Sequence, residues 1–253
     1  MQNRSYRQKL IYAALVGTYK LMARGITKNI EQMATNSENT ASRIRKYYGR
    51  DARVINPGVD FKDFYNDGDS RYFLYPSRFV VNKRQDYVIS AFSQFTKKSK
   101  ARGYRLILSG TLSRDPEHAK YFEKLKAMAK GLDVQFRTNI GDAELKRLYA
   151  GASAVMFAAI NEDYGFIPLE AMASSKPVIS VNEGGPRETV TDGKTGFLVG
   201  SPSEMAEKMQ LLAGDKALAE RMGNAGRRTV ERRYSWESFF DSLDPLMRKV
   251  GKA

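Results

Sequence analysis

The sequence predicts an α/β fold, a doubly wound parallel sheet with helices on both faces, and three observations support it. From Tyr72 onward, short runs rich in Val, Ile, Leu and Phe alternate with helical patterns. The runs are continuously apolar, which is typical of strands covered on both faces. Strand and helix follow each other repeatedly, and this order means right-handed crossovers between parallel strands.

The apolar runs and the helical patterns give the expected elements in chain order. Strands are expected at 72–77, 104–110, 134–138, 153–160, 177–181 and 196–200. Helices are expected near 85–101, 115–131, 142–151, 168–175 and 202–214. Ligands of such sheets bind beyond the carboxyl ends of the strands. We therefore expect the loop after 153–160, which contains Glu162, to face a ligand.

The two ends of the chain follow other patterns. Residues 6–32 are expected to be helical, and Ser37 is expected to cap a further helix. Residues 54–60 contain a Pro-Gly pair and are expected to be a connector. The C-terminal stretch 234–250 is expected to be an amphipathic helix that Pro245 bends or breaks. Apolar residues recur in the first helix at three- and four-residue spacing: Leu10, Ile11, Ala14, Leu15, Tyr19 and Met22.

Composition narrows the function classes. The 253 residues are 42% apolar and include no Cys, which excludes disulfides and thiolate–metal sites. The net charge is +14, and residues 1–50 hold ten Lys or Arg against two Glu. A basic end of this kind suits an anionic partner, such as a membrane surface, a nucleic acid or an acidic substrate.

One loop combines two carboxylates with a helix start. Seven residues separate Glu162 from Glu170, and Pro168 suits the first turn of a helix. The free N–H groups around Gly165 would bind an anion, while the carboxylates would face hydroxyl groups. A nucleotide sugar, which has a diphosphate between two polyols, fits this arrangement. Alternatively, Glu170 only complements the helix dipole and Glu162 is a solvated loop residue.

The same stretch, "EDYGFIPLEAMASSKPVIS", resembles the signature of the retaining glycosyltransferases of family four, which have the GT-B fold. Other segments are similar to further marks of that family, in order: "NPGVD" (56–60), "SRFVVNKR" (77–84) and "GGPRETVTDGKTGFLV" (184–199). The resemblance runs from about Met33 to Trp236. Ser77 and Ser175 stand where the family commonly has glycine.

The resemblance implies a domain organisation. Residues 51–230 would form one complete, Rossmann-like C-terminal GT-B domain that binds the nucleotide-sugar donor. Residues 1–50 would be a basic, mostly helical remnant of the N-terminal acceptor domain, and 231–253 the C-terminal crossover helix. Two such domains need roughly 300 or more residues, so we expect the acceptor half to be missing or supplied by a partner chain. The uncovered terminal helices would then favour self-association or contact with an anionic membrane surface.

The resemblance also implies roles for single residues. Glu162 would be the catalytic residue beside the donor sugar, and Glu170 would bind the ribose. Arg78 and Lys83 would neutralise the diphosphate, although bare Arg and Lys are most often surface residues. The remaining donor-binding positions would be Ile140 at the nucleobase, which is alternatively a core residue, and Gly165, Phe166 and Ile167 at the helix start. No metal and no cofactor are expected, because these positive groups replace the metal.

Two other features are expected to lie outside the site. Asp67-Gly68-Asp69 matches a metal-binding triplet of the other major glycosyltransferase fold, but Asp-Gly is also ordinary turn chemistry, which we favour. His118 is the only histidine, so no Ser-His-Asp triad or histidine metal cluster can be built around it, and we expect a surface position.

The sequence thus predicts a retaining, metal-independent hexosyltransferase domain that uses a nucleoside-diphosphate sugar and a glycan or lipid-linked acceptor. It would act in cell-envelope glycan biosynthesis, in the cytoplasm or peripherally at the inner face of the membrane. One alternative is a non-catalytic nucleotide-sugar-binding or regulatory module that needs a partner chain. The other is a nucleic-acid-binding protein, which we disfavour because no nucleic-acid motif is visible.

Overall fold

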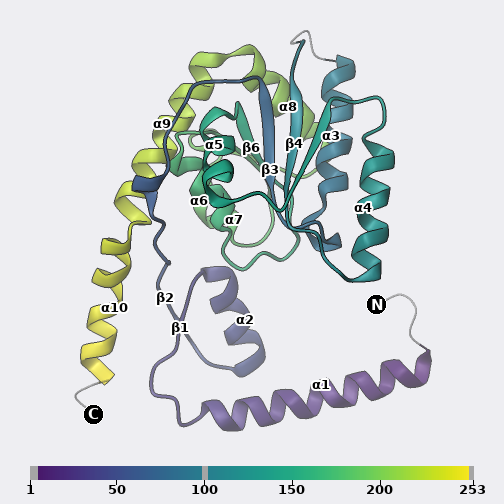
Figure 1. Ribbon diagram of the computed structural model, residues 1–253. Helices are drawn as coiled ribbons and strands as arrows, with labels where there is room; N and C mark the ends of the chain where they lie inside the picture. Colours follow the sequence, from purple (N-terminus) through teal and green to yellow (C-terminus); the bar gives the residue numbers. More distant parts are fainter. Residues whose placement is uncertain (1–4, 99–101, 251–253) are drawn as a thin grey trace. The chain divides into compact units, whose positions relative to one another are not determined.

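A computed structural model describes residues 5–98 and 102–250 (Figure 1). The chain divides into two compact units, one of residues 57–239 and the other of residues 1–56 with 240–253. The last residues of the expected helix at 85–101 lie outside the described residues.

The larger unit is built on a sheet of six parallel strands within the described residues, in the order β5-β4-β3-β6-β7-β8. This order confirms the doubly wound parallel sheet. Successive strands are added toward one edge from β3 to β5 and toward the other edge from β6 to β8, and such folds bind ligands at the switch point between β3 and β6. The strands are β3 (Tyr72–Pro76), β4 (Arg105–Gly110), β5 (Val134–Thr138), β6 (Ala154–Phe157), β7 (Val178–Val181) and β8 (Gly196–Val199).

Helices cover both faces of this sheet (Figure 1). Successive strand residues point to opposite faces, so Phe73 and Tyr75 enter one core while Leu74 enters the other. The core with Phe73 includes residues of α3, α4 and α8, and the core with Leu74 includes residues of α5, α6 and α9. The larger unit contains η1 (Phe61–Asp63), η2 (Val81–Lys83), α3 (Gln85–Lys98), α4 (Pro116–Met128), α5 (Asp142–Gly151), α6 (Phe166–Ala173), α7 (Pro186–Thr189), α8 (Pro202–Gly214), α9 (Lys216–Arg233) and the start of α10 (Trp236–Val250).

The long helix α9 was not expected from the sequence. Gly223 and Gly226 interrupt its apolar pattern, and isolated glycines lower the confidence of a helix prediction. The structure shows why they are there. A Cβ atom would lie 2.0 Å from the backbone oxygen of Ser175 at Gly223, and 2.8 Å from Cγ of Met172 at Gly226. These glycines therefore let α9 approach α6 and the turn after it closely.

The segment that opens the larger unit is tied to the segment near its end. Val59 donates its backbone N–H to the carbonyl of Tyr234 at 2.8 Å. Pro57 accepts a hydrogen bond from the Tyr164 hydroxyl at 2.7 Å. Tyr164 is buried and lies in the loop between β6 and α6, which also contains Glu162.

The smaller unit contains α1 (Tyr6–Thr27), β1 (Ala34–Thr35), α2 (Glu38–Tyr48) and β2 (Arg53–Val54), with β1 parallel to β2. Helix α1 ends at Thr27 rather than at residue 32. Arg50 donates hydrogen bonds to the backbone oxygens of Lys28 and Ile30, which follow the end of this helix. Ser37 caps α2 as expected, because its hydroxyl accepts from the amide of Thr40 at 3.1 Å. The large apolar side chains of the α1 stripe are exposed, namely Leu10, Ile11, Leu15, Tyr19 and Met22.

The C-terminal helix α10 runs from Trp236 through Pro245 to Val250. Of the two effects expected of Pro245, a bend or a break, the break is therefore absent, since one missing backbone hydrogen bond does not end this helix. Within the described part of the chain, no helix is long and apolar enough to cross a membrane.

Candidate functional site

A cavity of about 250 Å³ opens beyond the carboxyl ends of β3 and β4, where the topology predicts a ligand. It brings together four of the site residues predicted from the sequence: Arg78, Ile140, Ile167 and Glu170. Other parts of its wall come from the ends of the two strands and from helix α5, namely Pro76, Ser77, Ser109, Gly110, Thr111, Leu145 and Tyr149. Arg78 is exposed, whereas Ile140 and Ile167 are half-buried, so a ligand would meet both charge and apolar surface.

Glu170 is held in this cavity by a tyrosine. The hydroxyl of Tyr149, on α5, donates to Oε2 of Glu170, on α6, at 2.5 Å. Burial raises the pKa of Glu170 above its usual 4.5, while the Tyr149 hydroxyl acts in the opposite direction. Sequence reasoning missed Tyr149, because nothing in the local pattern around it indicates a partner 21 residues away.

Lys83 and Glu162, both predicted site residues, do not line this cavity but form an ion pair between the segments that follow β3 and β6. Lys83 Nζ lies 2.5 Å from Glu162 Oε2, and the two side chains are 12% and 27% exposed. The Tyr75 hydroxyl donates to the backbone oxygen of Lys83 at 2.5 Å, and Ile160 donates its amide to Asn82 at 2.9 Å. The turn η2 is therefore tied both to β3 and to the segment after β6, which places the ammonium against the carboxylate.

The loop of Glu162 is also supported by the glycine-rich turn before α7. Gly185 donates its amide to the backbone oxygen of Glu162 at 2.8 Å. Arg84 donates to the oxygen of Ala158 at 2.6 Å and pairs with Glu183 at 3.1 Å. Arg84 and Glu183 were not predicted as site residues, although the turn itself was among the segments recognised. They stabilise the backbone that carries Glu162.

Helix α6 begins at Phe166, two residues earlier than expected, with Gly165 as its N-cap. Gly165 has φ +88°, which favours glycine, and a Cβ there would lie 3.1 Å from Cγ of Pro186. Phe166 is 46% exposed. The amides of Phe166 and Ile167, in the first turn, have no acceptor within the helix, so this end of α6 carries partial positive charge.

The site thus combines cationic groups, a helix N-terminus and two carboxylates at the switch point of a parallel sheet. Residues 59–229 match the family model described as glycosyl transferases group 1. The chain belongs to this family.

Similar curated proteins of this family are longer than the chain. An α-1,3/1,6-mannosyltransferase of Dictyostelium discoideum is 30% identical over 72% of the chain and 46% of that protein. The corresponding enzyme of Rhizomucor pusillus is 28% identical over 94% of the chain and 61% of that protein. A D-inositol 3-phosphate glycosyltransferase of Streptomyces bingchenggensis is 27% identical over 82% and 50%. The chain therefore spans about half of the length of these group 1 relatives.

Solved structures agree on the fold. HepE of Anabaena in complex with UDP has a TM-score of 0.80 at 20% identity, over 92% of the chain and 68% of HepE. The C-terminal domain of a group 1 glycosyl transferase of Francisella tularensis has a TM-score of 0.61 at 25% identity. That match covers 70% of the chain and 99% of the Francisella domain.

Asp67, Gly68 and Asp69 do not line the cavity that holds Glu170, and they lie in a turn before β3. Gly68 has φ +74° and donates its amide to Oδ1 of Asn66 at 3.1 Å, which is the turn chemistry expected there. His118 is half-buried, and its Nδ1 lies 3.0 Å from the Ser113 hydroxyl. Over residues 5–98 and 102–250, no group of three or more His, Asp or Glu could hold a metal ion.

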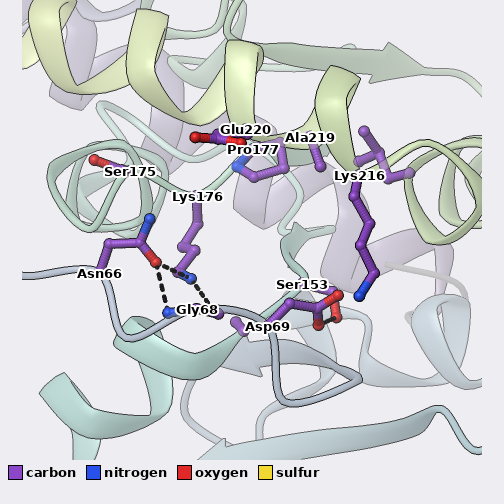
Figure 2. Close-up of a pocket in the computed structure, with 12 residues that line it drawn as sticks. Asn66, Gly68, Asp69, Ser153, Ser175, Lys176, Pro177, Lys216, Ala219 and Glu220 are labelled. Atoms are coloured by element: carbon purple, nitrogen blue, oxygen red, sulfur yellow. Dashed lines mark hydrogen bonds between the residues drawn. The ribbon is translucent and has the colours of Figure 1, made fainter.

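A second cavity, of about 390 Å³, lies at the amino ends of β6 and β7, around Lys176 (Figure 2). Lys176 is 4% exposed, and its ammonium donates to Oδ1 of Asn66 at 2.6 Å and to the oxygen of Gly68 at 2.5 Å. Burial lowers the pKa of Lys176 to about 8. Its hydrogen bonds are internal, and the lysines lining the cavity are balanced by Asp69 and Glu220. Lys176 thus secures the 66–69 turn.

Proposed function

We propose that the chain is the donor-binding domain of a retaining glycosyltransferase. The enzyme would transfer a hexose from a nucleoside-diphosphate sugar to a glycan or lipid-linked acceptor. The observation that supports this best is the Lys83–Glu162 pair in the segments after β3 and β6, together with the cavity after β3 and β4 that Arg78 and Glu170 line. Positive groups for a diphosphate and carboxylates for hydroxyl groups occur together there.

In this proposal the donor lies along the strand ends. Arg78, Lys83 and the first amides of α6 bind the diphosphate, while Glu170 accepts a hydrogen bond from the ribose. Ile140 lies against the nucleobase. Glu162 contacts the sugar next to the bond that breaks.

The chemistry needs charge stabilisation at two places. Negative charge develops on the departing diphosphate, where preorganised donors lower the barrier most. Lys83, Arg78 and the amide groups supply these donors, so the reaction requires no metal and no cofactor. Glu162 stabilises the positive character of the anomeric carbon. Lys83 is paired with Glu162 in the structure, and in this proposal donor binding moves Lys83 to the phosphates and lets the Glu162 carboxylate turn to the sugar.

The names of the relatives guide the choice of substrates. Several are mannosyltransferases, and HepE was solved with UDP and with UDP-glucose. A hexosyl donor linked to uridine or guanosine diphosphate agrees with both. For the whole protein we propose a glycan or lipid-linked acceptor in the cell envelope and a cytoplasmic location, with peripheral contact at the inner face of a membrane. The exposed apolar side chains of α1 among basic residues support that contact, or pairing with another chain.

Calorimetric titration with UDP, GDP and their hexose conjugates, in buffer containing EDTA, tests the proposal. We expect one of the two nucleotide families to bind, and at a hundred times its Kd to stabilise the fold by ~2.7 kcal/mol. Lys83→Ala and Arg78→Ala should weaken binding. Lys124→Ala, which removes an exposed lysine paired with Asp86, should not. No binding of either family, or binding abolished by EDTA, would contradict the proposal.

A further inference from the structure

Tyr149 is the one hydrogen-bond donor to Glu170 that the described residues provide from another helix. Its hydroxyl lies 2.5 Å from Glu170 Oε2. The Tyr149 side chain is completely buried, and its ring meets that of Phe64 edge-on, with centroids 5.7 Å apart. A buried ring packed against Phe64 cannot follow Glu170 if the carboxylate turns. Tyr149 therefore fixes the direction of that carboxylate.

We propose that Tyr149 is a positioning residue that directs Glu170 toward the ribose and so makes the site select ribonucleotides over deoxyribonucleotides. This inference rests on the proposed function. With one carboxylate oxygen bound to Tyr149, the other remains for the ligand in the cavity that both residues line. A fixed acceptor binds a ribose hydroxyl at that position through a hydrogen bond, and it makes no such bond to a sugar that lacks the hydroxyl.

The charges around Glu170 agree with this role. Burial and Asp142 disfavour its ionised form, whereas Tyr149 and Lys146 favour it. Arg78, across the cavity, is exposed. Removal of the Tyr149 hydroxyl takes away the larger of the two effects that favour the ionised form, so it disturbs both the direction and the ionisation of the carboxylate.

The test compares Tyr149→Phe with Tyr72→Phe. Tyr72 is a matched control because it is also buried and its hydroxyl donates to the backbone of Leu148 at 2.7 Å, without touching Glu170. Calorimetry would measure UDP and GDP against their 2′,3′-dideoxy forms. We expect Tyr149→Phe to weaken the preferred ribonucleotide about five- to tenfold and to leave the dideoxy form within about twofold, as for loss of a hydrogen bond to a charged group.

Two further measurements separate positioning from general loosening of the fold. Carbon NMR titration of the ligand-free protein should show a higher pKa for Glu170 in Tyr149→Phe than in Tyr72→Phe. Glu170→Gln, which keeps Tyr149, should lose the same preference for ribose. Equal losses for ribo- and dideoxy ligands, or unchanged ribose preference, would overturn the role of Tyr149 alone. A wild-type protein that binds no nucleotide would overturn the proposed function and this inference together.

Discussion

Replacement of Glu162 by Gln should tighten the binding of a nucleoside diphosphate, although Glu162 is the proposed catalytic residue. In the ligand-free chain Glu162 holds Lys83 at 2.5 Å, with both side chains largely shielded from water. A diphosphate must draw Lys83 away from that partner. Gln keeps the shape of Glu and can still accept a hydrogen bond, but it no longer holds the ammonium by charge.

The size of the effect follows from the pair. A hydrogen bond between charged groups is worth about 1.5–3 kcal/mol net. The Gln amide keeps part of this, and partial exposure reduces the rest, which leaves about 1 kcal/mol, or about fivefold in Kd. Glu162 also repels the phosphates, and its removal acts in the same direction. Added salt should shrink the difference, because it screens both effects.

Calorimetry with UDP and GDP in EDTA, at two salt concentrations, measures the change. Glu183→Gln is the matched control, because Glu183 pairs with Arg84 rather than with Lys83. Donor turnover by Glu162→Gln should be lost wherever the wild-type protein shows turnover. Unchanged or weaker nucleotide binding in Glu162→Gln would refute the exchange of Lys83 between carboxylate and phosphate.

Three other outcomes follow from the structure. Nucleotide affinity should be full at neutral pH and fall as pH drops through the raised pKa of Glu170, since the uncharged acid accepts a weaker hydrogen bond from the ribose than the carboxylate does. Calorimetry across pH should show a flatter profile for Glu170→Gln. Gly165→Ala should cost about 1–2 kcal/mol in denaturant unfolding, because φ +88° strains any residue with a Cβ, and should weaken nucleotide binding by moving the start of α6. Lys176, whose pKa is about 8 in the fold and 10.5 as a free side chain, binds fewer protons in the native state between these values. The free energy of unfolding of wild type minus that of Lys176→Met should therefore rise by about 1.4 kcal/mol per pH unit from pH 8 to 10.5, and a flat difference would contradict this linkage.

Much of the fold was predictable because its physical cause is local. Continuous apolar runs mark strands buried on both faces, and the helices at 142–151 and 202–214 begin and end where the sequence places them. Helix α9 was not predictable in this way. Its glycines are needed because a side chain there would clash with the Ser175 backbone or with Met172, which lie far away in the sequence.

The candidate site divides in the same way. Glu162, Glu170 and Lys83 belong to segments that could be recognised from the sequence. The ion pair between Lys83 and Glu162 could not be predicted in this way. The Lys83–Glu162 contact joins residues 79 positions apart, and the Arg84–Ala158 bond joins residues 74 apart. Tyr149 occupies an ordinary apolar position of α5, and only the packed structure shows that its hydroxyl reaches a carboxylate.

The hydrogen bond between Tyr164 and Pro57 has a mechanical consequence. Pro57 is the first residue of the larger unit, and Tyr164 is two residues from Glu162. Val59 is hydrogen-bonded to Tyr234, so the first and last segments of the larger unit are joined near the same point. A change in the position of Pro57 would therefore be felt by the loop of Glu162 through a single hydrogen bond. The start of the larger unit is thus fixed to a point two residues from the carboxylate proposed to touch the sugar.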